Sequence, residues 1–224
     1  MALGDLDLFV FDLAGTTVKD DDCVLRAFEG AARDAGLQTE REWLRARMGW
    51  SKTEVFGQLL ERHDRDAGAA PALVRAFEEH LVRIYDHAPI TPTEGAEGAI
   101  LALEDAGVRV AFSTGFPRAI CDRILAATGW ADRISVASDE VPRGRPAPDL
   151  IHEAMRRASV PDAGRVGAAG DTPSDLEAAL RAGCKVAAGL GCGTHALAEL
   201  ARHRHTHLAD GPMELVAQLR DSGS

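Results

Sequence analysis

The sequence lacks several features that are typical of secreted, membrane-bound or nucleic-acid-binding proteins. Its four cysteines show no C-x-x-C spacing, so we interpret them as reduced thiols rather than a disulfide framework. No apolar run is long enough to cross a bilayer, and no basic segment precedes the first apolar run, so we expect no signal peptide. A net charge of −10 disfavours contact with nucleic-acid phosphates. We therefore expect a cytoplasmic protein that binds neither a membrane nor nucleic acid.

The chain nevertheless has enough apolar residues for a substantial core. Of its 224 residues 46% are hydrophobic, which suits one core domain with a smaller insert. Short strand-like runs, rich in Val, Ala and Phe, alternate with longer helical patterns, and this order predicts an α/β fold with a doubly wound parallel sheet. The expected strands are 6–11, 108–113, 134–137, 165–170 and 185–189, and the expected helices between and after them are 95–106, 117–128, 148–159, 173–182, 195–202 and 212–220.

Residues 19–92 interrupt this alternation. They contain no convincing strand and predict four helices, near 22–35, 40–48, 52–62 and 71–87. We interpret them as a helical cap inserted into a core made of residues 1–18 and 93–224. Thr91 is a candidate N-cap for the helix that follows the cap, with Pro92 as its first residue.

Polar side chains follow four strand or loop ends of the predicted core. They are Asp12, Thr114 with Gly115, Arg145 between Gly144 and Pro146, and Asp171 with Asp175. Thr172 is also a candidate N-cap for the last of these helices. Because ligands bind at the carboxyl ends of strands in such a sheet, we expect these groups to share one site.

This combination suits phosphoryl chemistry. Asp12 and Asp171 can bind a hard cation such as Mg²⁺, and Thr114 and Gly115 can hold phosphoryl oxygens. Arg145 can neutralise their charge, and Asp12 can attack phosphorus to form an aspartyl phosphate. Each residue alone is more typical of capping or a solvated turn, but their order along one sheet favours a catalytic site.

With "FDLAGTT", "STGF", "GRPAP" and "GDTPSD", the sequence resembles the haloacid dehalogenase (HAD) superfamily, and within it the phosphonatase branch. The resemblance implies a Rossmann-like core, a helical cap, an aspartyl nucleophile and Mg²⁺ held by Asp12, the Ala14 carbonyl and Asp171, with Asp175 in support. Phosphatases of the superfamily carry a second acid where this chain has Ala14. A carbon leaving group needs no such acid, because it has no alkoxide oxygen to protonate.

The resemblance also assigns a role to a lysine of the cap. In "RMGWSKTEV", Lys52 matches the lysine that forms an imine with the substrate aldehyde in this branch. Ser51 and Glu54 suggest a capping box that places Lys52 in the first helical turn, where the helix dipole favours the neutral amine. Two alternatives stay open: a charged Lys52 that anchors a second anionic group of a phosphate ester, and a solvated lysine without a role.

Two cap and pocket positions depart from this branch. Val55 stands where it has a histidine, and Phe116 where it has a tyrosine. We expect the substrate to be bound by six residues in all: Ala14, Thr16, Met48, Trp50, Gly115 and Phe116.

The leading hypothesis is a Mg²⁺-dependent hydrolase that cleaves the C–P bond of phosphonoacetaldehyde or a related phosphonate. Its alternatives are a phosphatase acting on a small phosphate monoester and a non-catalytic binding protein. We also expect a homodimer formed through the cap. The alternating histidines of "HRHTH" are interpreted as part of a solvated loop.

Overall fold

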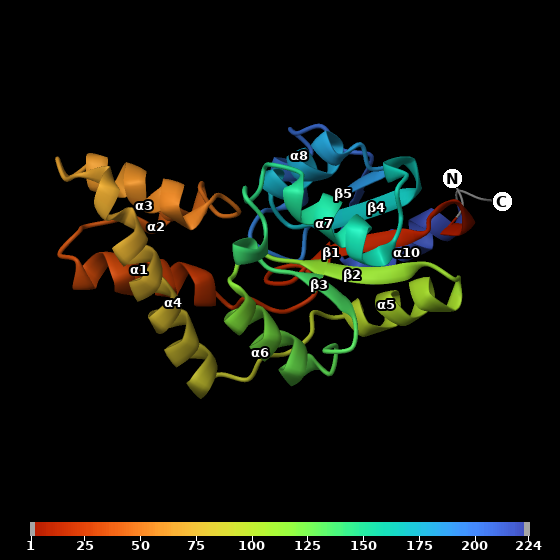
Figure 1. Ribbon diagram of the computed structural model, residues 1–224, viewed down its shortest axis with the longest axis horizontal. Helices are drawn as coiled ribbons and strands as arrows, with labels where there is room; N and C mark the ends of the chain where they lie inside the picture. Colours follow the sequence, from red (N-terminus) through yellow and green to blue (C-terminus); the bar gives the residue numbers. More distant parts are fainter. Residues whose placement is uncertain (1–2, 222–224) are drawn as a thin grey trace. The chain divides into compact units, whose positions relative to one another are not determined.

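The computed structural model describes residues 3–221. Its larger unit, Met1–Lys19 with Thr91–Ser224, is built on a six-stranded parallel sheet of order β3-β2-β1-β4-β5-β6 (Figure 1). The strands are β1 (Leu8–Asp12), β2 (Arg109–Ser113), β3 (Ile134–Val136), β4 (Val166–Gly170), β5 (Val186–Leu190) and β6 (His207–Ala209). The predicted α/β fold class is therefore confirmed, with strand order reversing beside β1.

Helices cover both faces of this sheet (Figure 1). One face carries α7 (Asp149–Ala158) and α8 (Pro173–Ala182), and the other carries α5 (Ala96–Asp105), α6 (Arg118–Thr128) and α10 (Pro212–Asp221). Short helical segments complete the unit: η1 (Leu3–Asp5), η3 (Ser138–Glu140), η4 (Ala163–Arg165) and α9 (Leu197–Leu200).

Alternate side chains of β1 supply both halves of the core. Leu8 and Val10 pack with α7 and α8, whereas Phe9 and Phe11 point to the opposite face, where their ring centroids are 4.6 Å apart. Gly167 lies beside Phe9 in the parallel register, and a Cβ at Gly167 would lie 2.5 Å from the Phe9 ring. A strand buried on both faces thus reads as an unbroken apolar run that ends at Asp12.

The second unit, Asp20–Ile90, is entirely helical. Its elements are α1 (Cys23–Asp34), α2 (Arg41–Arg45), α3 (Lys52–Glu61), η2 (Ala67–Ala69) and α4 (Ala70–His87). Phe28, Phe56 and Phe77 form its aromatic centre, with ring centroids 4.6 to 6.4 Å apart. The unit therefore has a hydrophobic core of its own.

Three local predictions were wrong. Residues 207–209 form the edge strand β6, so the predicted solvated loop holds for the exposed His203 and His205 but not for His207. Thr91 does not cap a helix, because Pro92 pairs with Val18 in a β-bridge and α5 begins only at Ala96. Ser51 does precede α3, but its side chain makes no capping hydrogen bond.

All four cysteines are free thiols, of which only Cys192 is exposed. Within residues 3–221, every helix is too short or too polar to span a bilayer.

Candidate active site

Asp12 ends β1 and is followed by a tight turn. Asp12 is only 6% exposed, and its main-chain carbonyl accepts a hydrogen bond from Thr17 Oγ1 at 2.8 Å. The chain reverses through Gly15, whose φ of 87° favours glycine and whose N–H donates to the Val18 carbonyl at 2.7 Å. In residues 3–221 no hydrogen bond reaches the Ala14 carbonyl, which leaves that oxygen available to a ligand.

Asp171 follows β4, the strand that pairs with β1, and is 1% exposed. Its carboxylate accepts hydrogen bonds from Thr16 Oγ1 at 3.2 Å and from the Thr194 N–H at 2.7 Å. Burial, and then the nearby charge of Asp12, raise the pKa of Asp171 to about 6. The two carboxylates are therefore electrostatic neighbours although they lie far apart in the sequence.

Arg145 connects Asp12 to Asp175. Its Nη2 lies 2.5 Å from Asp12 Oδ1, and its Nη1 donates to Asp175 Oδ1. The Arg145 side chain is only 9% exposed. The other Asp175 oxygen accepts from the Thr172 N–H at 3.1 Å and from Thr172 Oγ1 at 2.6 Å, so Asp175 also caps α8.

Thr114 follows β2 on the other side of β1. The register pairs Asp12 with Ser113, which places Thr114 just beyond the nucleophile candidate. The Thr114 hydroxyl accepts from the Phe116 N–H at 3.2 Å, and its own proton remains to be donated. Phe116 is 2% exposed.

A loop after β5 completes the surroundings of Asp171. The sequence had suggested a loop near the site here, but none of its residues was predicted as a site residue. Thr194 supplies a backbone donor, and Cys192 Sγ lies 3.6 Å from the Gly15 carbonyl. A Cβ at Gly193 would collide with the Gly15 carbonyl and with Asp171, so only glycine allows this approach. The alternating glycines of "GLGCGTH" were the available signal.

The charges of this cluster suit a divalent cation. If Asp12, Asp171 and Asp175 are ionised, the single guanidinium of Arg145 leaves two negative charges uncompensated in a buried place. No group of three or more His, Cys, Asp or Glu side chains in residues 3–221 is arranged as a metal cluster. Mg²⁺, however, commonly uses one or two carboxylates and keeps several waters, so Asp12, Asp171 and the Ala14 carbonyl fit it.

Of the other predicted site residues, Thr16 belongs to the core unit, and Met48, Trp50 and Lys52 belong to the helical unit. Thr16 is fully buried and donates to Asp171 rather than facing open space. In the helical unit, Lys52 is the first residue of α3 and is half-buried, and Met48 is buried. Val55 is 1% exposed and belongs to the core of that unit.

Trp50 lies in the bend that leads to Lys52. The Arg47 guanidinium lies 5.6 Å from the Trp50 ring centroid and 4.0 Å from that of Trp43, and it donates to Gln58 at 2.9 Å. This bend is therefore tied to both α2 and α3.

The chain is similar to known hydrolases in sequence and in structure. The sequence model of the haloacid dehalogenase-like hydrolase family matches residues 6–183. Phosphonoacetaldehyde hydrolase of Bacillus cereus is 28% identical over 200 residues, covering 80% of this chain and 73% of that protein.

Two further proteins resemble the chain. A phosphonoacetaldehyde hydrolase-like protein of Syntrophobacter fumaroxidans is 30% identical over 192 residues, covering 78% and 68% of the two chains. The crystal structure of a phosphonoacetaldehyde hydrolase-like protein from Oleispira antarctica superposes with a TM-score of 0.86 at 19% identity, covering 99% and 94%.

Proposed function

Because the chain belongs to the haloacid dehalogenase-like hydrolase family, we propose that this hydrolase transfers a phosphoryl group from a small organic substrate to Asp12 and then to water. The substrate class that we favour is phosphonoacetaldehyde or a related phosphonate. The relatives named phosphonoacetaldehyde hydrolase support this choice.

The observation that carries the proposal is the convergence of Asp12, Asp171, Asp175 and Arg145. In this proposal an oxygen of Asp12 bonds to phosphorus while the bond to the leaving group breaks. Thr114 and the Gly115 N–H hold phosphoryl oxygens, and Arg145 turns from the carboxylates to the incoming phosphoryl group. Water then cleaves the aspartyl phosphate and releases inorganic phosphate.

A divalent cation, which we propose to be Mg²⁺, would be held by Asp12, the Ala14 carbonyl and Asp171, with Asp175 in support. When bound, it would reduce the repulsion between the carboxylate nucleophile and the anionic phosphoryl group. The turn at Gly15 and the Thr194 N–H orient two of these ligands before any cation arrives.

The methyl group of Ala14 favours a carbon leaving group. Ala14 has no acidic group that could protonate a departing alkoxide. We propose that the Lys52 amine condenses with the substrate aldehyde, with loss of water, and that the protonated imine accepts the electron pair of the breaking C–P bond to give an enamine. Protonation of the enamine carbon and hydrolysis of the resulting imine then release the organic aldehyde and return the amine. Lys52 is half-buried at the first position of α3, which supports a role at a substrate rather than in solvent.

A second candidate is hydrolysis of a small phosphate monoester, with Lys52 as an anion anchor. The observation in its favour is the loss of polar groups: Val55 is buried in the cap core, and Phe116 has no hydroxyl. Neither residue can move a proton for an imine reaction.

A phosphate-release screen separates the two candidates. The panel contains phosphonoacetaldehyde and small phosphate monoesters, each with Mg²⁺ and with EDTA, for the wild type and for Lys52→Arg. The guanidinium keeps the positive charge but forms no useful imine, so phosphonoacetaldehyde turnover should fall at least about 100-fold. Near-normal turnover of that substrate by Lys52→Arg would eliminate the imine. Hydrolysis of esters alone, little changed by the substitution, would establish the second candidate.

A further inference from the structure

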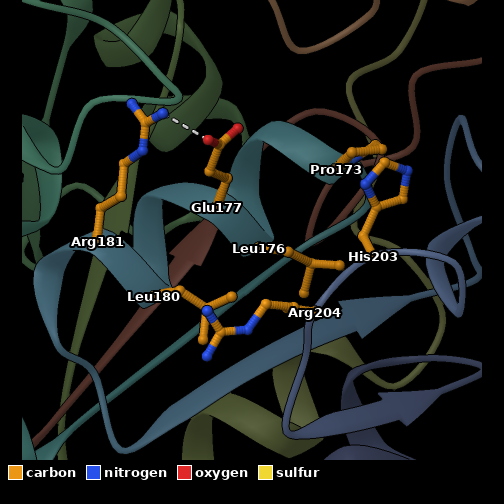
Figure 2. Close-up of a pocket in the computed structure, with 7 residues that line it drawn as sticks. All are labelled: Pro173, Leu176, Glu177, Leu180, Arg181, His203 and Arg204. Carbon is orange, nitrogen blue, oxygen red and sulfur yellow. Dashed lines mark hydrogen bonds and ion pairs between the residues drawn. The ribbon is translucent and has the colours of Figure 1, made fainter.

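A basic cavity on α8 uses residues that the proposed reaction does not. It has a volume of about 490 Å³ and lies between α8 and the 203–204 segment that joins α9 to β6 (Figure 2). None of its lining side chains belongs to the acid and arginine cluster described above. The cavity is therefore a separate place on the core unit.

One wall of the cavity is apolar. Pro173, Leu176 and Leu180 follow one another at helical spacing along one face of α8 and line this wall. Leu176 is 1% exposed, and Leu180 packs against the hydrophobic core that lies between the sheet and the helices α7 and α8. This wall is consequently rigid, and its partly exposed residues Pro173 and Leu180 offer carbon contacts to a ligand.

The opposite side carries a cation without an acidic partner. Arg181 pairs with Glu177 at 2.5 Å, as the dashed line in Figure 2 shows. The Arg204 guanidinium, by contrast, makes no hydrogen bond or ion pair to any residue between 3 and 221, and it projects beside Leu180. His203 lies next to it in the chain and faces Pro173. The cavity thus presents Arg204 and His203 to a ligand.

The segment that carries Arg204 is anchored. Thr206 donates its N–H to the Ala187 carbonyl at 2.8 Å, and the Ala187 N–H donates to Thr206 Oγ1 at 2.9 Å. On the other side, the His203 N–H donates to the Leu200 carbonyl at 2.9 Å. The backbone at Arg204 is therefore held between two fixed points, so binding has to order the side chain but not the segment that carries it.

We propose that this cavity binds a small organic anion whose acidic head pairs with Arg204 and whose apolar body lies on Pro173 and Leu180. A positive spot on a chain of net charge −10 selects anions over cations. A carboxylate or phosphate head suits a guanidinium because both can accept two parallel hydrogen bonds. The apolar wall favours an anion with carbon atoms over an inorganic one, and the volume lies in the range of small-molecule sites.

Benzoate is a suitable probe, and benzamide is its uncharged match. Both are titrated into ¹⁵N-labelled wild type, Arg204→Gln and Arg202→Gln at neutral pH, and amide shifts are followed by NMR. Arg202 is exposed, lies two residues before Arg204 and does not line the cavity, so its variant controls for the general loss of one positive charge. Arg204 is also exposed, so both variants should fold, which thermal unfolding verifies.

Benzoate should shift amides of residues 176–181 and 203–206, and benzamide should bind at least about tenfold more weakly. Arg204→Gln should weaken benzoate binding at least about tenfold, and Arg202→Gln by less than about twofold. Equal binding by the two variants would overturn the proposal. Shifts confined to residues around Asp12 would overturn it as well. Shifts at 203–206 that grow with protein concentration in the absence of any probe would also overturn it, because they would show that a second copy of the chain occupies the cavity.

Discussion

Arg145 holds two carboxylates that stand far from it and from one another in the sequence. It lies 2.5 Å from Asp12 and also pairs with Asp175. Asp171 receives hydrogen bonds from neutral groups of Thr16 and Thr194, and no cationic side chain pairs with it in the described part of the chain. Burial therefore raises its pKa, and this residue is the most sensitive reporter of the charge imbalance.

The first prediction concerns pH in metal-free buffer. The pKa of Asp171 is about 6 in the folded chain against an ordinary value of 3.8, so the folded state binds the proton more tightly than the unfolded state. Its contribution to stability is complete below about pH 4 and is lost as pH rises towards 6 and above. The free energy of unfolding of wild type, relative to Asp171→Asn, should fall by roughly 2–3 kcal/mol over this range.

Urea unfolding in EDTA at several pH values measures this difference. Mg²⁺ should reduce the loss, because a cation pairs with the ionised carboxylate. A difference that stays flat from pH 4 to 7 would contradict the described surroundings of Asp171.

A second residue-scale prediction concerns Gly15. An alanine there meets an unfavourable φ of 87°, and its Cβ would lie 2.5 Å from Asp171 Oδ2. Gly15→Ala should destabilise the chain by more than about 1 kcal/mol and should also weaken Mg²⁺ binding at least about tenfold. Gly107→Ala is the matched control, since Gly107 has a φ of 81° and open space around its Cα.

Both variants carry the cost of the backbone conformation, but only Gly15→Ala displaces Asp171. Calorimetric titration with Mg²⁺ separates them. Equal Mg²⁺ affinity in the two variants would show that Asp171 does not hold the cation.

At the scale of elements, the periodicity of apolar residues predicted most helices and strands. The exceptions are β6 and the segment around Pro92. β6 is short and lies in "HTHLA", where the polar residues give no apolar strand pattern. As an edge strand it pairs with β5 alone. Pro92 looked like a helix start, but it pairs with Val18 and Gly95 then turns the chain into α5. Such tertiary pairings are not visible in a single sequence.

An element-scale prediction follows from the end of α7. Ser159 caps this helix in the left-handed region, with a φ of 54°, which is unfavourable for a residue with a Cβ. Ser159→Gly should raise the free energy of unfolding by about 1 kcal/mol. Ala106→Gly is the control, because Ala106 ends α5 with a φ of −82°, where glycine brings no relief.

Chemical denaturation of the two variants gives the answer. We expect a gain for Ser159→Gly and no gain, or a small loss, for Ala106→Gly. Destabilisation by Ser159→Gly would show that the serine side chain stabilises the helix end.

At the scale of the whole molecule, the candidate site could be predicted only in part. Strand ends identified Asp12, Thr114 and Asp171 because a parallel sheet gathers its carboxyl ends at one edge. The backbone N–H of Thr194 could not be found in this way, since a main-chain donor leaves no side-chain signature. The pairing of Asp175 with Arg145 and Thr172 also depends on distances that no spacing rule supplies.

The proposed chemistry divides its residues between the two units. Asp12 and its partners belong to the core unit, and Lys52 belongs to the helical unit of residues 20–90. In this proposal the phosphoryl half of the reaction depends on the core unit, and the choice of organic substrate depends on the helical unit. Substitution of Lys52 should change which substrates react, and substitution of Asp12 should stop every reaction.

Covalent trapping on Asp12 tests this account most directly. Wild type and Asp12→Asn are mixed with Mg²⁺ and either phosphonoacetaldehyde or a small phosphate monoester, quenched in acid within a single turnover, and digested for peptide mass spectrometry. We predict a phosphoryl group on the wild-type peptide that contains Asp12, and neither that adduct nor phosphate release from Asp12→Asn. Phosphate release by Asp12→Asn at the wild-type rate, or a phosphoryl group carried by another residue, would contradict the account.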